Sequence, residues 1–356
     1  MVWGRRITLK SRELLRSAIR HEACIRKGMR SRLLALTLVI LGSNYLYGQA
    51  VRAAVHMVPS GKGWSVNIDD ATAPQSAAVQ QSAAVWQSIA RNSKSNGIIY
   101  HGGRIMPNTV HVYFIWYGNW TGGKAHSDSQ TTVTLLESLY ARVGGVGGSK
   151  YASTLSTYAD TTATVSGSYY LAGAISDNYS QGKNLSDASV KQVVTSAIQS
   201  GKLPKDTNAL YFVLTSSDVN ETSGFCTKYC GWHDHGTILK SDIKFGFVGN
   251  SDRCAASCEA QMQSPNGDSG ADGMASVLTH ETAESLTDPD FNAWYDAAGQ
   301  EVGDKCAWTY GPVTGQVGYG AYNQSFNGHN FLLQMLWENS RGGGCVQSRG
   351  GAFYNR

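Results

Sequence analysis

The sequence predicts an α/β or α+β fold in which helices pack on a mixed sheet within a single domain. Two observations carry this prediction. Segments rich in β-branched and aromatic residues alternate with segments of helical periodicity across residues 98–350, and such alternation is typical of a sheet covered by helices. The same region holds six cysteines, which predicts loops braced by disulfides.

The N-terminal 50 residues have the features of a secretory signal. Residues 1–32 hold ten lysines and arginines, and the run Leu33–Gly42 is apolar. Ten apolar residues are too few to cross a bilayer, which needs about 20. Gly48 and Ala50 supply the small residues of a cleavage site. We therefore expect a secreted protein with no stable membrane anchor after cleavage; the alternative is an uncleaved anchor.

The leader is unusually long if translation starts at Met1. A start at Met29 gives "MRSRLLALTLVILGSNYLYGQA", a compact signal, so the preceding residues are interpreted as a misassigned start.

The leader also explains the formal net charge of +4, because residues 33–356 hold 20 basic and 24 acidic residues. A nucleic-acid partner is not expected, since phosphate binding needs clustered lysine and arginine on the folded part.

The folded domain, residues 98–350, is expected to follow an Ala-, Ser- and Gln-rich lead-in at residues 51–97. Residues 109–120, "TVHVYFIWYGNW", are dense in β-branched and aromatic side chains and predict a buried strand. Residues 127–143 have a polar start and apolar residues at helical spacing, which predicts a helix.

The alternation continues through the middle of the domain. Residues 219–242 and 259–273 interrupt it, and their glycine-rich, polar composition predicts two irregular loops. The remaining predicted elements are a strand at 162–173, a helix at 186–203, and strands at 208–217 and 243–250.

Six cysteines lie outside the leader and allow 15 pairings. Their spacing along the chain favours local pairs, with the rival interpretation that the two CxxxC pairs form a zinc site. The rival is weaker because an exported chain meets oxidising conditions. The favoured pairs are Cys226 with Cys230, Cys254 with Cys258, and Cys306 with Cys345.

The stretch "ADGMASVLTHETAESLTDP", residues 271–289, predicts a helix that ends at a proline. His280 and Glu284 are four residues apart, so their side chains project from one face and can share one metal ion. Glu281 then takes the place of the general base in HExxH zinc hydrolases. This HExxE arrangement resembles a zincin active-site helix, with a carboxylate replacing the second histidine.

A catalytic zinc needs three protein ligands and one open position. Glu301 and Asp304 follow the helix in "GQEVGDKC", and His233 lies upstream in "CGWHDHG". We rank the third ligand as Glu301, then Asp304, then His233. Zinc is the expected ion, with manganese or calcium as alternatives because the site is rich in carboxylates. The competing interpretation is a solvent-exposed polar helix face without a metal.

Five stretches of this chain carry a resemblance to a known family. They are "YHGGRIMPNTVHVYFIWYGNW", "GFCTKYCGWH", "THETAESLTDPDFNAWY", "GDKCAW" and "FNGHNFLLQMLWENSRGGGCV". Together they resemble the EXORDIUM, or phosphate-induced protein 1, family. The resemblance implies a secreted or wall-associated protein, linked in plants to growth and to carbon or hormone responses, with no established enzymatic activity. His280, Glu281 and Glu284 fall at family-like positions. The long leader and the lead-in depart from the plant pattern and fit a microbial homologue.

Two functions therefore compete. The first is a secreted metal-dependent hydrolase, in the form of a peptidase, acting on an extracellular peptide. The second is a non-enzymatic extracellular protein that binds a cell-wall polymer or signals through the disulfide-held loops. The metal content of the mature chain separates them most directly.

Overall fold

The structure is a computed structural model that describes residues 97–121, 128–316, 319–340 and 342–354. The predicted signal sequence at residues 1–50 and all but the last residue of the predicted lead-in lie outside the described residues. No helix in the described ranges is long and apolar enough to cross a membrane.

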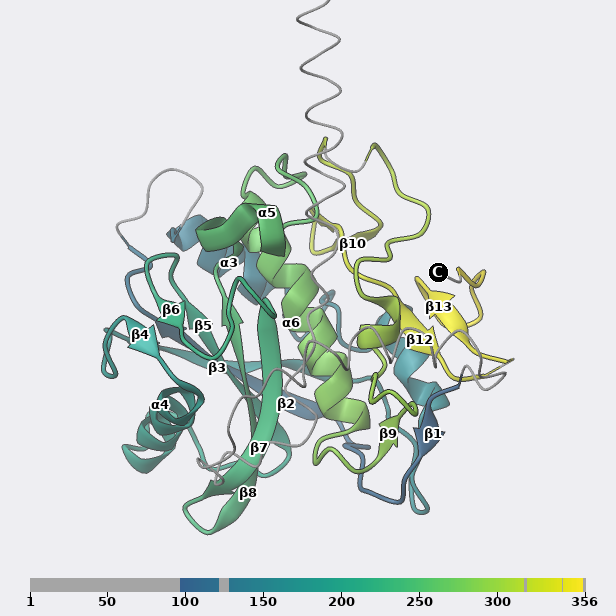
Figure 1. Ribbon diagram of the computed structural model, residues 1–356, viewed down its shortest axis with the longest axis horizontal. Helices are drawn as coiled ribbons and strands as arrows, with labels where there is room; N and C mark the ends of the chain where they lie inside the picture. The colour runs from purple at the N-terminus through teal and green to yellow at the C-terminus, as the bar shows by residue number, and fades with distance from the viewer. Residues whose placement is uncertain (1–96, 122–127, 317–318, 341, 355–356) are drawn as a thin grey trace, which may run out of the picture. The chain divides into compact units, whose positions relative to one another are not determined.

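A five-stranded mixed sheet forms the centre of the fold (Figure 1). Its strand order is β3-β2-β5-β8-β7, with the first four strands parallel and β7 antiparallel to β8. The predicted α/β architecture with a mixed sheet is confirmed. The strands are β2 Val110–Tyr117, β3 Tyr169–Asp177, β5 Ala209–Thr215, β7 Gly231–Ile238 and β8 Ser241–Gly249.

Three main helices cover the sheet: α3 Gln130–Leu139, α4 Asp187–Gln199 and α6 Ser269–Thr287. The chain steps from β2 to β3 in one direction and from β3 to β5 in the other, so right-handed crossovers place α3 and α4 on opposite faces. Accordingly, α4 contacts β5 and β8, whereas α6 contacts α3, β7 and β8. Figure 1 shows α4 and α6 on either side of the sheet.

Short elements in the last third of the chain cover the side of α6 that faces away from the sheet (Figure 1). The contact of α6 with β11 belongs to this cover, and η1, from the middle of the chain, contacts the helix as well. The helix is therefore enclosed on both sides. The short elements of the whole domain are β1 Ile99–Tyr100, η1 Ala152–Thr157, β4 Asn184–Leu185, β6 Asn220–Glu221, η2 Ser251–Cys254, α5 Ala255–Cys258, β9 Trp294–Tyr295, η3 Asp304–Cys306, β10 Gln324–Phe326, β11 His329–Phe331, β12 Leu336–Glu338 and β13 Gly344–Val346.

The structure differs from the predicted elements at two places. The strand predicted at 162–173 begins only at Tyr169, because the preceding residues form a turn closed by a bridge between Ala159 and Thr164. The loop predicted at 219–242 contains β7. Its polar sequence "GWHDHGTI" suggested a surface loop, yet two adjacent residues of it are almost completely buried. His233 points at α6, whereas Trp232, on the other face of the strand, packs against Phe245 and Phe247 of β8.

All six cysteines form disulfides, but two of the three predicted pairs are wrong. The observed bridges join Cys226 to Cys254, Cys230 to Cys258 and Cys306 to Cys345. The first two tie the segment before β7 to η2 and α5, and each spans 28 residues. The rival zinc site of four thiolates is also wrong, since every one of these sulfurs is bonded to another. Three disulfides suit an oxidising compartment.

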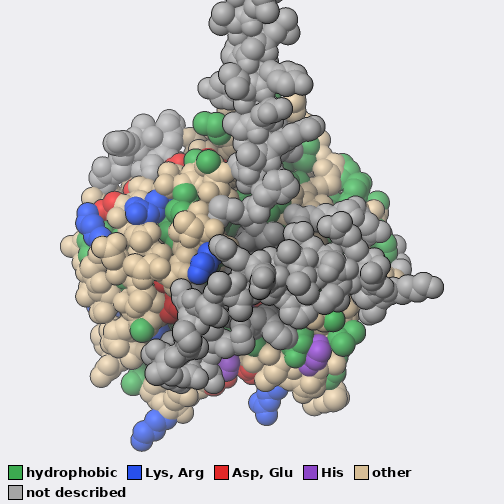
Figure 2. Space-filling view, in the orientation of Figure 1, with side chains coloured by type: hydrophobic (Ala, Val, Ile, Leu, Met, Phe, Trp, Pro, Cys, Tyr) green, Lys and Arg blue, Asp and Glu red, His purple; other side chains and the backbone are tan. Residues whose placement is uncertain are grey.

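Figure 2 shows lysine and arginine side chains at separated points over the described part of one face.

Candidate metal centre

Helix α6 is buried along its whole length, from Gly270 to Thr287. Its hydroxyl side chains bond to the helix itself: Thr282 donates to the Leu278 carbonyl at 2.8 Å, and Ser285 donates to the Glu281 carbonyl at 2.7 Å. Hydroxyls satisfied in this way can be buried at little cost. The carboxylates of Glu281 and Glu284 make no such hydrogen bonds to the helix. The interpretation of an exposed polar face is therefore wrong.

One group of donor atoms gathers around the Nε2 atom of His280. This atom lies 3.0 Å from Oε1 of Glu284 and 3.6 Å from Oδ1 of Asp304. One donor atom from each of the three residues lies within 4.8 Å of the others. Ligands bound tetrahedrally to zinc at about 2.0–2.1 Å are about 3.3 Å apart. The observed separations fall on both sides of that value, so one ion could bind all three residues.

A second group lies against the first and shares Glu284. His233, projecting from β7, places Nε2 3.2 Å from Oε2 of Glu301 and 3.7 Å from Oε2 of Glu284. Glu281 joins this group, because His233, Glu281 and Glu284 also offer donors within 4.8 Å of one another. Every sequence-predicted site residue thus lies in one cluster. Glu301, ranked first as third ligand, lies beside His233, and the second-ranked Asp304 lies beside His280.

The segment after β9 positions the two distant acids. The backbone N–H of Asp304 donates to Oε1 of Glu284 at 2.9 Å, which holds this segment against α6. The N–H of Glu301 donates to Oδ2 of Asp304 at 3.3 Å. Cys306 ends the short helix η3 and bonds to Cys345, so a covalent tie lies two residues after Asp304.

Burying the ionisable side chains of this cluster without a bound ion costs free energy of folding. The six side chains range from 0% to 7% exposed. Five carboxylate oxygens of the cluster have no hydrogen-bond partner. They are both oxygens of Glu281, Oε2 of Glu284, Oε1 of Glu301 and Oδ1 of Asp304. The backbone N–H of His233 approaches Glu281 without reaching hydrogen-bond geometry. Buried carboxylates need hydrogen bonds or counter-charges.

Cationic side chains do not supply that counter-charge within the described part of the chain. There, no lysine or arginine forms an ion pair with any of the four carboxylates. The contact of His280 with Glu284 is short but lacks hydrogen-bond geometry. When its carboxylates are ionised, the cluster has excess negative charge beside two imidazoles, a donor set that suits zinc or manganese.

The pKa values reflect the same imbalance. Burial, together with the charge of neighbouring carboxylates, raises the pKa of Glu281 and of Glu301 well above the usual range. Burial opposes the charged form of His280, yet Glu284 and Asp304 outweigh it and raise the pKa of this imidazole. Burial lowers the pKa of His233 to about 4, so this side chain is neutral at pH 7 and has a lone pair to donate.

Gln334 is a site residue that sequence reasoning missed. Its Oε1 lies 3.0 Å from Nδ1 of His280, and both side chains are buried. An amide oxygen only accepts, so Nδ1 carries a proton, and Nε2, which faces Glu284 and Asp304, is the nitrogen that would give up its proton to bind a cation. No local motif marks this glutamine, which is 54 residues from its partner.

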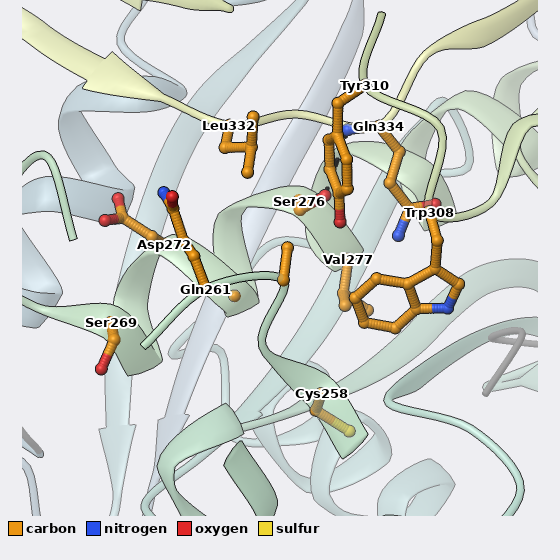
Figure 3. Close-up of a pocket in the computed structure, with 12 residues that line it drawn as sticks. Cys258, Gln261, Ser269, Asp272, Ser276, Val277, Trp308, Tyr310, Leu332 and Gln334 are labelled. Atoms are coloured by element: carbon orange, nitrogen blue, oxygen red, sulfur yellow. Dashed lines mark hydrogen bonds between the residues drawn. The ribbon is translucent and has the colours of Figure 1, made fainter. Parts of the chain in front are cut away.

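A narrow cavity ends at Gln334 (Figure 3). Trp308, Tyr310 and Leu332 line it opposite Ser276 of α6. Ser276 is one turn before His280 on the same helix face. The cavity volume is about 10 Å³, close to the room that one water molecule needs. The residues that line the cavity include Gln334 but none of the six side chains of the cluster.

We expect Gly303→Ala to weaken metal binding about 10–100-fold, the usual effect of disturbing the support of a ligand. A Cβ at this position would lie 2.7 Å from the His280 ring, although the backbone φ of −83° suits any residue. Metal titration with a competing chelator would measure the loss. Gly173→Ala is the control, because its Cβ would meet nothing closer than 3.5 Å. Equal affinities for both variants and the native chain would contradict the expectation.

A third group of donors lies apart, nearer the surface. His235, Asp242 and Asp290 also offer donors within 4.8 Å of one another. Here the Nζ of Lys244 already bonds to both carboxylates. This outer group therefore has its own counter-charge and differs from the buried cluster.

Comparisons with known proteins agree on one family. The family model described as "Phosphate-induced protein 1 conserved region" matches residues 98–347. Protein EXORDIUM-like 5 of Arabidopsis thaliana is 32% identical over 67% of this chain and 74% of its own length. Protein PHOSPHATE-INDUCED 1 of Nicotiana tabacum is 29% identical over 68% of this chain and 85% of its own length.

No solved structure matches the chain. The match to the family model covers the central sheet, α6 and every residue of the buried cluster. The chain therefore belongs to the phosphate-induced protein 1 family, as the resemblance of its sequence motifs predicted.

Proposed function

We propose that this chain is a secreted metal-dependent hydrolase, in the form of a peptidase, with His280, Glu284 and Asp304 as ligands of a divalent cation. The observation that supports it best is the gathering of these donors at separations of 3.0 and 3.6 Å in a buried, negatively charged site. Zinc is the first choice and manganese the second. Two imidazoles make calcium, which prefers oxygen ligands, the least suited.

Glu281 is the proposed general base. A cation at this site would polarise the carbonyl group of a substrate and make the attacking water more acidic. Glu281 follows His280 directly, and neither of its oxygens has a hydrogen-bond partner in the described structure. Ionised beside the positive charge of the cation, it would accept the proton of the water and pass it to the leaving amine. Gln334 keeps His280 in the orientation that ligation requires.

The proposed site of action is outside the cell. The signal-like leader and the three disulfides support export. The proposed substrate is an extracellular peptide, because the HExx spacing on a helix is that of zinc peptidases.

Metal analysis of the purified mature chain tests the proposal. After exposure to excess zinc or manganese and removal of free metal, we expect at least one equivalent to remain bound. The loaded protein should cleave members of a library of unstructured peptides, as measured by mass spectrometry, and a chelator should stop the cleavage. Less than about a tenth of an equivalent would end the proposal, since a closed metal site holds its ion tightly.

Burial favours a second candidate, a non-enzymatic extracellular protein that binds a wall polymer and whose cation is structural. Catalytic zinc keeps an open position, whereas the donors here are almost inaccessible. Under this alternative, bound metal would accompany no peptide cleavage, and the loaded chain would bind wall polysaccharides in a pull-down. Cleavage that depends on Glu281 would exclude it.

A further inference from the structure

We infer that the buried cluster is a two-cation site, in which His233, Glu301 and the Oε2 atom of Glu284 bind a second divalent cation beside the first. This inference rests on the proposed function, because it extends the same site. Nothing in the HExxE motif itself indicates a second ion, since His233 comes from β7 and Glu301 from the segment after β9.

Each half of the cluster is centred on one imidazole. Around His280, the distances to Glu284 Oε1 and Asp304 are 3.0 and 3.6 Å. Around His233, the distances to Glu301 and Glu284 Oε2 are 3.2 and 3.7 Å. Each imidazole thus has contacts with two carboxylates, one of which is Glu284, and the half around His233 also includes Glu281. A carboxylate that offers one oxygen to each half is placed to bridge two ions, which in two-metal sites are about 3.5–4 Å apart.

Charge provides an independent argument. The cluster holds four carboxylates, from Glu281, Glu284, Glu301 and Asp304, and all are buried. One divalent cation would leave two negative charges uncompensated when all four are ionised, whereas two cations would balance them. Uncompensated charge in the interior is strongly unfavourable. No described lysine or arginine supplies the difference through an ion pair.

A simple histidine–glutamate hydrogen bond does not account for the second half. The contact between His233 and Glu301 uses Nε2 and Oε2. It leaves Oε1 of Glu301, Oε2 of Glu284 and both oxygens of Glu281 without hydrogen-bond partners. A second cation would satisfy the oxygens that face His233, and Glu281 lies close enough to either ligate it or act on a water beside it.

The stoichiometry of bound zinc tests the inference. The mature native chain, equilibrated with zinc and freed of excess, should retain two equivalents by elemental analysis. Glu301→Gln and His233→Ala should each retain one. His235→Ala is the matched control and should retain two, because this histidine lies on the same strand but in the outer group with Lys244. Near-ultraviolet circular dichroism should show that each variant is folded.

The outcomes separate the two proposals. One equivalent in the native chain would overturn the second site and leave the one-cation hydrolase standing, whereas none would end both. Loss of an ion in His235→Ala but not in His233→Ala would also overturn the inference, since it would place the second ion in the outer group.

A spectroscopic measurement on the native chain avoids dependence on the variants. Loaded with two equivalents of Mn²⁺, the protein should give the electron paramagnetic resonance spectrum of an exchange-coupled pair, because the ions would be about 3.5–4 Å apart. Two independent six-line spectra would show ions at separate places and overturn the bridging role of Glu284.

Discussion

Glu281→Gln should lower the rate of peptide cleavage by about 10²–10⁴-fold, the usual contribution of a general base. The amide has nearly the shape of the carboxylate but cannot take a proton from water. The substitution removes one negative charge from a cluster in which like charges repel, so it should not unfold the chain. At least one equivalent of zinc should remain bound, because the three proposed ligands of the first ion are unchanged.

Ser285→Ala is the control on the same helix. It removes only a hydroxyl that donates to the Glu281 carbonyl of α6, and its cleavage rate should stay close to that of the native chain. Steady-state cleavage and elemental analysis on the same samples would check both variants. A Glu281→Gln chain that holds metal and cleaves at the native rate would remove Glu281 from the mechanism and would favour a structural cation.

Metal should stabilise the native chain by an amount set by its affinity. With free zinc at about 1,000 times the dissociation constant, the free energy of unfolding should rise by about 4 kcal/mol per site. Glu284→Gln should lose most of this gain, because Glu284 contributes a donor to both halves of the cluster. Urea unfolding with the disulfides intact, in chelator and in zinc, would measure both quantities.

The metal-free comparison isolates the effect of the ion. Without metal, Glu284→Gln removes one of several buried like charges but also the counter-charge of His280, so the free energy of unfolding should change by less than the gain that zinc gives the native chain. Glu338→Gln is the control: it changes a buried glutamate whose carboxylate accepts from Ser340 and the Gly350 N–H. It should keep the full response to zinc. A zinc response in Glu284→Gln equal to the native one would contradict the assignment of this ligand.

The central sheet and its helices were predictable because their side-chain periodicity follows their burial. Strand β7 was not, for a physical reason. Sequence patterns identify a half-buried strand by alternating apolar residues, whereas β7 directs His233 into a polar interior. Because its buried side chains are polar, a strand that carries candidate ligands has the sequence pattern of a loop. The same conflict between local pattern and burial is expected where function overrides packing.

The cluster was predictable only as far as helix geometry reaches. Spacing along α6 placed His280 and Glu284 on one face, since that depends only on 3.6 residues per turn. The roles of Glu301 and Asp304 relative to the two histidines depend on how a distant segment docks, which local sequence does not encode. Disulfide pairing failed for the same reason: short separation in sequence favoured neighbours, but the fold brings residues 28 apart within bonding distance.

The bridge between Cys306 and Cys345 links the oxidation state of the surroundings to the assembly of the site. In a reducing cytosol these thiols would stay apart, and the segment carrying Glu301 and Asp304 would lack its covalent anchor two residues beyond the second acid. A chain with these thiols reduced would then hold its acids loosely. Under the proposed function, the site would become competent for hydrolysis only once this disulfide has formed.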